Sequence, residues 1–222
     1  VQLILAVSEG QITLSSLTDL AVTAGENGSR TITVRGTLAE INAVLGAGIT
    51  YEPDENYNGA DTLSVTLNDL GSTGDLGGPK EVSETLAITV NPVNDAPTVD
   101  AITVSATEDT AKTFTLTSSD VDLGSNAIDD ASVNRYRIVT LPANGTLATS
   151  DNQAVSAGDI ITLAQATDMK FTPADDFNGT TSFAFAALDE AGAESGQASV
   201  TINVAAVNDI PVITGAGDSV TY

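Results

Sequence analysis

Acidic and amide side chains gather in a few short motifs, and their oxygens are the groups of this sequence that could do chemistry. Asp120-Val121-Asp122 and the later Asp189 stand where predicted strands end or begin, and Asn94-Asp95 lies in a short linker segment. Such oxygens suit hard divalent cations, and Ca²⁺ takes about six to eight of them in tolerant geometry, whereas Mg²⁺ demands a stricter octahedron. The residue types therefore predict calcium binding.

The composition removes most catalytic chemistries. The chain has no histidine and no cysteine, so a Ser-His-Asp triad, a Cys-His pair, a thiolate or imidazole zinc site and a disulfide framework are all excluded. Paired carboxylates could still hydrolyse a glycosidic bond. We expect the carboxylates at domain ends and not in an aromatic-walled cleft, so we predict that the chain is not an enzyme.

The charge balance excludes two classes of partner. Thirty acidic and seven basic residues give the chain a formal net charge of -23. Nucleic acid and anionic membranes both attract basic surfaces, so neither is an expected partner. The sequence also has no apolar run long enough to cross a bilayer, and we expect no membrane insertion.

An internal repeat organises the chain. The segment from Tyr51 to Gly59, YEPDENYNG, matches Phe171 to Gly179, FTPADDFNG, at an offset of 171 − 51 = 120 residues. Further on, Val93-Asn94-Asp95-Ala96-Pro97 matches Val207-Asn208-Asp209-Ile210-Pro211 at an offset of 207 − 93 = 114 residues. The difference falls in the loop between Gly71 and Glu81, where loop length costs little.

The repeats predict an all-β fold. Apolar residues alternate with Ser and Thr, for example at Leu86, Ile88 and Val90, which is typical of half-buried strands in an antiparallel sandwich. Thr37-Leu38-Ala39-Glu40 and Thr162-Leu163-Ala164-Gln165 are capping boxes, so we expect one short helical turn in each repeat, with Leu38, Ile41 and Leu45 facing the core. In the second repeat the predicted strands are 99–106, 112–117, 134–141, 146–150, 169–172, 181–188 and 198–204.

The repeat boundaries predict an incomplete first copy. We assign residues 1–92 to a repeat that lacks its first two strands, 93–97 to a linker, 98–206 to a complete repeat, and 207–222 to a linker and the start of a third repeat. An unpaired sheet edge is a liability. We therefore expect another chain's tail, or pairing between molecules in a crystal, to replace the missing strands.

The strand order of a seven-stranded sandwich brings the acidic motifs to two ends. Asp120, Asp122, Asp189 and Asn94-Asp95 meet at one end, and Asp54-Glu55 of the first repeat faces the same junction. Glu108, Asp175, Asp176, Asn208 and Asp209 form a parallel set at the other end. Crowded carboxylates repel by about 4 kcal/mol per pair at 4 Å, and Ca²⁺ would remove this penalty. The alternative is that these residues cap and turn the chain without any metal.

The motifs together resemble a known family. Val93-Asn94-Asp95-Ala96-Pro97, Thr107-Glu108-Asp109-Thr110, Asp120-Val121-Asp122 and Asp176-Phe177-Asn178-Gly179 are similar to the tandem cadherin-like repeats of large bacterial surface adhesins of the RTX type. The resemblance implies an Ig-like sandwich and the same junction ligands, with Ala96 offering its carbonyl. Pro92 stands where that family's linker has an Asp, so we expect one or two ions per junction.

The resemblance implies a structural role. We expect a secreted, cell-surface spacer in which Ca²⁺ stiffens the junction between neighbouring repeats of the same polypeptide. Homophilic or strand-exchange contacts and a surface glycan or protein target are the other expected partners. The alternative is a module whose sandwich face binds carbohydrate or protein directly, although only 4% of the residues are aromatic.

Overall fold

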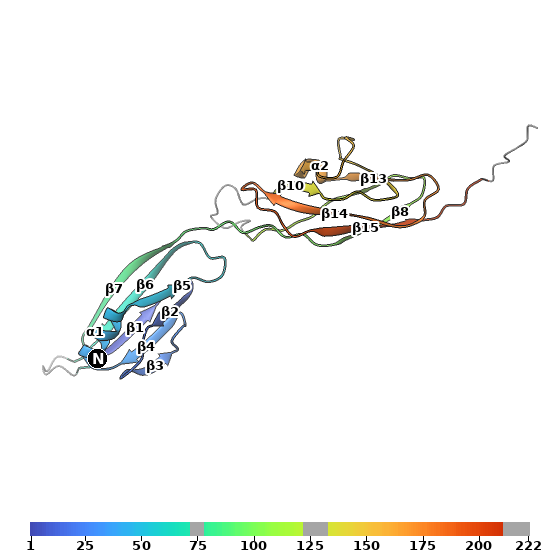
Figure 1. Cartoon of the computed structure of the whole chain (residues 1–222). Helices are drawn as coiled ribbons and strands as arrows, with labels where there is room; N and C mark the ends of the chain where they lie inside the picture. The colour runs from blue at the N-terminus through green and yellow to red at the C-terminus, as the bar shows by residue number, and fades with distance from the viewer. Residues whose placement is uncertain (72–77, 122–132, 211–222) are drawn as a thin grey trace, which may run out of the picture. The chain divides into compact units, whose positions relative to one another are not determined.

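The structure is a computed structural model that describes residues 1–71, 78–121 and 133–210. These residues fall into two compact units, 1–93 and 94–210. Each unit is described by itself below, with the elements labelled in Figure 1. No helix in the described ranges is long and apolar enough to cross a membrane.

The first unit is a sandwich of two antiparallel sheets. The larger sheet has the order β3 (Ala21–Gly25), β4 (Thr31–Arg35), β1 (Gln2–Ala6), β6 (Gly59–Asn68) and β7 (Glu81–Val90). The smaller sheet pairs β2 (Gln11–Leu14) with β5 (Ile49–Glu52). The core between them holds fully buried side chains from both sheets and from the helix α1 (Leu38–Ala47), including Leu3, Leu5, Ile12, Ile32 and Ile41.

The second unit repeats this plan, with two strands that the first unit lacks and without an equivalent of β3. One sheet has the order β12 (Ile160–Thr162), β10 (Val133–Ile138), β14 (Gly179–Asp189), β15 (Ala198–Ala205) and β8 (Ile102–Thr107). The other has the order β11 (Gly145–Ala148), β13 (Met169–Pro173) and β9 (Lys112–Phe114), and the helix α2 (Leu163–Ala166) follows β12. All pairs are antiparallel except β8 with β15, which run parallel. The predicted all-β sandwich fold is confirmed.

The sequence did not predict the three strands β3, β4 and β12. β4 and β12 each lie directly before a capping box, and β3 belongs to an insertion of the first unit. Gly10 to Tyr51 spans 41 residues, whereas the equivalent Gly145 to Phe171 spans 26, so the first unit carries 41 − 26 = 15 more residues here. All five residues of β3 are exposed, and such a strand carries no buried alternation for a pattern search to find.

Both predicted capping boxes are present. The Thr37 hydroxyl accepts from the Glu40 amide at 3.3 Å and the Glu40 carboxylate accepts from the Thr37 amide at 2.7 Å, and Thr162 and Gln165 repeat this exchange. The helix that follows Thr37 runs for ten residues, longer than the single turn expected. The prediction that Leu38 faces the core was wrong. Its side chain is exposed and Val44 is buried instead, because the helix turns Ile41 and Val44 inward together.

Two equivalent glycines have positive φ, one at the corner between β1 and β2 and the other at the corner between β10 and β11. Gly10 has a φ of +115° and Gly145 has a φ of +147°. A Cβ on Gly145 would lie 2.5 Å from the Phe171 ring and 2.6 Å from the Thr172 carbonyl oxygen. The close approach of β11 to β13 therefore excludes any side chain at this position.

We predict that Gly145→Ala lowers the free energy of unfolding by about 3 kcal/mol, because strain at positive φ adds to a clash with a buried ring. Gly158 has a φ of +91° but open space around it, so Gly158→Ala isolates the backbone strain and should cost only about 1 kcal/mol. Urea unfolding of both variants measures the difference. Equal losses would contradict the role of the close approach.

Candidate metal-binding ends of the two units

Two of the predicted ligands, Asn94 and Asp189, are hydrogen-bonded to each other, and we call them together with Asp120 the N-terminal acidic cluster. The Asn94 amide nitrogen donates to Asp189 Oδ2 at 2.7 Å and to the Asp95 carbonyl at 3.0 Å. Asp120 follows a two-way backbone pairing of Thr98 with Ser119. The linker and the ends of two strand segments thus supply this cluster.

Asp189 is fully buried and already serves the backbone. Its Oδ1 accepts from the amides of Gly192 at 2.6 Å and Ala193 at 2.7 Å. Asp69 has the same place in the first unit, where its Oδ1 accepts from the amides of Gly71 at 2.9 Å and Lys80 at 2.8 Å. In both units this aspartate therefore caps the loop after β6 or β14, which is the metal-free role considered above.

Two oxygens of the N-terminal acidic cluster are buried. Asn94 Oδ1 has no hydrogen-bond partner among the described atoms. Asp120 Oδ2 is also buried. A buried acceptor without a partner is costly, and a hard cation is one species that would satisfy it. Asp95 and Ala96 are exposed, and Asp122 lies outside the described residues.

The opposite end of the second unit carries five carboxylates, and we call them the C-terminal acidic cluster. Its centre is Glu108, which is 3% exposed. Glu108 accepts from the Asn178 amide at 3.2 Å and from the Val207 backbone amide at 2.5 Å. The remaining members are Asp109, Asp175, Asp176 and Asp209, and all four are exposed. Asn208 is exposed beside them and donates to the Asp209 carbonyl at 3.4 Å.

The pKa of Asp109 is affected by the negative charges of this cluster. Burial and then the charges of Asp209, Glu108, Asp176 and Asp175 raise the pKa of its carboxyl above the usual value. Four like charges therefore act on one group, which places the five carboxylates near one another. The sequence analysis did not select Asp109 as a ligand, although its position beside Glu108 in the Thr107-Glu108-Asp109-Thr110 motif was the available signal.

The acidic pairs of the loops before β6 and β14 are turn residues. Asn56 and Asp176 occupy equivalent positions and have φ values of 60° and 57°. The Tyr57 amide donates to the Asp54 carbonyl at 3.0 Å, and the Phe177 amide donates to the Ala174 carbonyl at 3.1 Å. By this geometry Asp54 is equivalent to Ala174 and Glu55 to Asp175. The two pairs are therefore offset by one residue.

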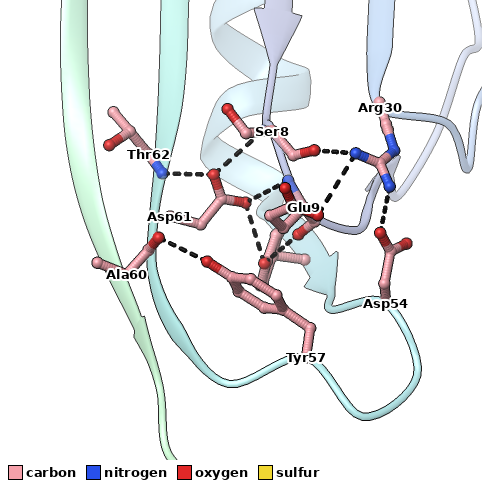
Figure 2. A network of polar contacts seen from close by, with 9 residues as sticks. Ser8, Glu9, Arg30, Asp54, Tyr57, Ala60, Asp61 and Thr62 are labelled. Carbon is pink, nitrogen blue, oxygen red and sulfur yellow. Dashed lines mark hydrogen bonds and ion pairs between the residues drawn. The ribbon is translucent and has the colours of Figure 1, made fainter. Parts of the chain in front are cut away.

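In the first unit Asp54 has a cationic partner. Its Oδ2 pairs with the Arg30 guanidinium, which also bonds the Ser8 carbonyl and lies 3.6 Å from Glu9 Oε2 (Figure 2). Glu55 is exposed. A cation bound by Asp54 would have to compete with Arg30, so Asp54 is a weaker candidate ligand than the sequence indicates.

A buried carboxylate lies next to this ion pair. Asp61 is 5% exposed and accepts from the amides of Ser8 at 3.1 Å, Glu9 at 3.1 Å and Thr62 at 2.7 Å, and from the Tyr51 hydroxyl at 3.0 Å (Figure 2). Burial by itself would raise the pKa of Asp61. The bonds from the backbone amides and from Tyr51 outweigh it, so the net pKa lies below the usual value. Burial and the bond to Asp61 raise the pKa of Tyr51 to about 12.

The second unit has no such network because both partners differ. Phe171 stands in place of Tyr51 and Thr181 in place of Asp61. Phe171 is fully buried, and the Thr181 hydroxyl is buried without a hydrogen-bond partner among the described atoms. Tyr and Asp therefore form a matched pair in the first unit, and this pair was missed because neither residue looked unusual in its motif.

The side chains as placed do not form a finished metal site. Within the described ranges, no three acidic side chains are grouped so that they could hold a metal ion. The available donors are nevertheless all carboxylate, amide and carbonyl oxygens, which suits Ca²⁺. Four carboxylates of the C-terminal acidic cluster are exposed, and exposed side chains change rotamer quickly, so they can turn toward an ion. The predicted calcium site stays a prediction.

A comparison with known families found one match, and it falls on the second unit. Residues 94–203 match the model of a family described as a bacterial Ig domain. Over these residues the second unit is similar to a bacterial Ig domain. The match covers Asn94 to Asn203, so it includes the linker asparagine and every strand of the second unit up to most of β15.

The chain is also similar to several solved structures. Chicken VE-cadherin EC1-2 is 17% identical with a TM-score of 0.39, and the match covers 91% of this chain and 83% of that one. The adhesin InvE of Yersinia pseudotuberculosis is 16% identical with a TM-score of 0.26, over 92% and 49% of the two chains. An endo-fucoidan hydrolase of glycoside hydrolase family 107 is 16% identical with a TM-score of 0.35, over 92% and 24%. No curated protein matches the chain.

We predict that Asp61→Asn lowers the free energy of unfolding of the first unit by about 2–3 kcal/mol at neutral pH, because the amide turns NH₂ hydrogens toward N–H donors. A lowered carboxyl pKa stabilises the folded state above the unfolded pKa of about 3.9, and this contribution is lost as the pH falls through the folded pKa. The difference between the two proteins should therefore shrink below pH 4.

Hydrogen exchange of the β1 and β6 amides in a urea series measures this effect in the first unit alone. Asp19→Asn is the matched control. Asp19 is exposed at a φ of 64°, which Asn tolerates, so the control should change stability by less than about 0.5 kcal/mol. A pH-independent loss in Asp61→Asn would show that the charge has no part in it.

Proposed function

We propose that this chain is a non-catalytic, calcium-binding spacer from a secreted cell-surface adhesin. An Ig-like domain supports a structural or adhesion module. In the proposal, Ca²⁺ binds at the ends of the repeats and stiffens their junctions, and neighbouring repeats of the same polypeptide are the first partners.

The C-terminal acidic cluster carries the proposal. Its members are the buried Glu108 and four exposed carboxylates, and burial together with the charges of the other four raises the pKa of Asp109. Like charges held together destabilise the folded state unless a counter-ion is present. A divalent cation bound only by the folded state would convert this repulsion into stabilisation. Glu108 would act as the fixed member of the site, since its bonds to Asn178 and Val207 already hold it.

The N-terminal acidic cluster supports a second, smaller site. Asn94 Oδ1 and Asp120 Oδ2 are buried oxygens, and in the proposal Asp122 and the carbonyl of Ala96 complete their ligand set. Asp189 would contribute mainly by holding Asn94, because amide donors already occupy its oxygens. In the proposal, a site at each end of a repeat would let Ca²⁺ stiffen the junction with the repeat before it and the junction with the repeat after it.

Direct binding of carbohydrate through a sandwich face is the weaker alternative. Sugar-binding faces rely on exposed aromatic rings that stack on the ligand. Among the described residues, the large apolar side chains that are exposed are aliphatic, with Leu86, Val82 and Leu38 among them. The exposed apolar surface therefore suits contact with another protein segment better than contact with a glycan.

We predict that 10 mM CaCl₂ raises the melting temperature of the second unit by roughly 10 °C over the value in EGTA, and that 10 mM MgCl₂ does not. A ligand at one hundred times its Kd adds about 2.7 kcal/mol, and such an increment shifts the midpoint of a domain of this size by roughly that amount. Circular dichroism melts under the three conditions measure it. Equal melting temperatures in calcium and EGTA would overturn the calcium proposal and leave the sandwich fold untouched.

Asp109→Asn and Asp176→Asn test the location of the site. Both residues have a φ near +60°, which Asn tolerates, so the change removes charge and preserves the backbone. In EGTA each variant should melt above the unaltered protein, because repulsion is relieved, and in calcium each should gain less. Asp168→Asn is the control, since Asp168 has a φ of 58° and belongs to neither cluster. An unchanged calcium effect in both variants would exclude the C-terminal acidic cluster.

A further inference from the structure

The first unit has a cation of its own at the end where the turn after β1 lies beside the loop before β6. Arg30 Nη1 donates to the Ser8 carbonyl and lies 3.6 Å from Glu9 Oε2 (Figure 2). Arg30 Nη2 donates to Asp54 Oδ2. We call Ser8, Glu9, Arg30 and Asp54 the Arg30 corner. In it, two carboxylates and one backbone carbonyl share a single guanidinium.

Backbone hydrogen bonds hold the parts of the Arg30 corner in place. The Val7 amide donates to the Arg30 carbonyl at 2.9 Å, one step beyond the register of β1 with β4. The Glu9 amide donates to the buried Asp61 carboxylate at 3.1 Å, and the Asp54 carbonyl closes the turn before β6. The three charged side chains therefore start from fixed backbone positions, so the fold itself brings them together.

The equivalent end of the second unit lacks such a cation. The turn before β14 has the geometry of the turn before β6 and supplies Asp175 and Asp176 to the C-terminal acidic cluster. No ion pair between described residues includes a member of that cluster. The ion pairs are the two of Arg30 and one between Arg137 and Glu194. Equivalent ends of the two units thus differ in whether a cationic side chain balances their carboxylates.

The oxygens of the Arg30 corner are of the kind that calcium binds. Carboxylate and carbonyl oxygens are the ligands of Ca²⁺ in proteins, and a guanidinium uses the same oxygens through its forked N–H donors. A divalent ion at these oxygens would stand directly beside the guanidinium, and like charges at such a separation repel strongly. Arg30 and a metal ion therefore exclude each other at this place.

We propose that the Arg30 corner is a cation site that the chain fills with its own guanidinium. The first unit then needs no metal ion at this end, and this part of the inference stands by itself. The contrast with the C-terminal acidic cluster, which would take Ca²⁺, rests on the proposed function. Removal of the guanidinium leaves two carboxylates and a carbonyl without a counter-ion and opens them to Ca²⁺. One residue thus sets the calcium response of the first unit.

Arg30→Gln tests the proposal in the full chain, by hydrogen exchange of the β1 and β6 amides in a urea series. In EGTA their protection should fall roughly two- to fivefold, because the Arg30 side chain is 53% exposed and an exposed ion pair contributes no more than this. In 10 mM CaCl₂ protection should rise about tenfold in the variant, as for a site with a Kd of about 1 mM. It should rise less than about twofold in the unaltered protein. NaCl of equal ionic strength separates binding from screening.

Two further variants make the test specific. Arg35→Gln removes the same charge from the other end of β4, where Arg35 donates to the neutral Gln2 side chain at 3.1 and 3.3 Å. This variant should not respond to calcium. Arg30→Lys keeps a cation but loses the fork, so it should lose some protection in EGTA and stay insensitive to calcium. Circular dichroism verifies that all three variants fold.

The proposal is overturned if calcium protects the first unit of the unaltered protein as much as that of Arg30→Gln, or if this variant gains nothing beyond the NaCl effect. An equal gain in Arg35→Gln would also overturn it, since the response would then follow net charge. The β14 and β15 amides of the same samples test the calcium site of the second unit separately. If they do not respond while the first unit of Arg30→Gln does, the proposed function is contradicted and the inference about the Arg30 corner is supported.

Discussion

Every sheet in this molecule has to bury one apolar face, and the rest of the structure follows from how that face is covered. In the second unit the hairpin of β14 and β15 is closed by β8 and β9, and Val200, Ile202 and Phe183 are removed from water. In the first unit the hairpin of β6 and β7 has the same alternation of apolar residues, but these residues are more exposed. Hydrophobic burial contributes about 25 cal/mol per Å², so the less buried hairpin of the first unit gains less stabilisation from it.

Polar groups hold the first unit where apolar packing is thinner. Asp61 ties the turn at Ser8 and Glu9 to β6 and to Tyr51, and Arg30 ties the same turn to Asp54. The second unit manages the equivalent corner with Phe171 and a deeper core. A buried carboxylate that accepts four hydrogen bonds is stable only while all of its donors stay in place. This corner of the first unit therefore depends on geometry more than on packed area.

The acidic residues at the strand ends have structural roles in the loops and turns, whether or not they also bind an ion. Asp69 and Asp189 cap loops, Glu108 holds the chain where β15 ends, and Asn56 and Asp176 supply the left-handed turn residue. These duties fix where the oxygens lie, and they leave four exposed carboxylates around Glu108. Turn formation and cation binding are compatible uses of the same side chains, because a carboxylate oxygen can accept more than one contact.

The sequence by itself determined the fold class, the repeat, both capping boxes and the strands with strict alternation, because period-two burial and local capping are short-range patterns. It also selected most acidic residues that lie at the ends of the second unit. Only the tertiary structure decided that Asp61 is a buried acceptor, that Asp109 belongs to the charged cluster, that Asp54 has Arg30 as a partner and that Leu38 points outward. Each of these depends on segments that are distant in the chain and adjacent in space, and such contacts leave no local periodicity to detect.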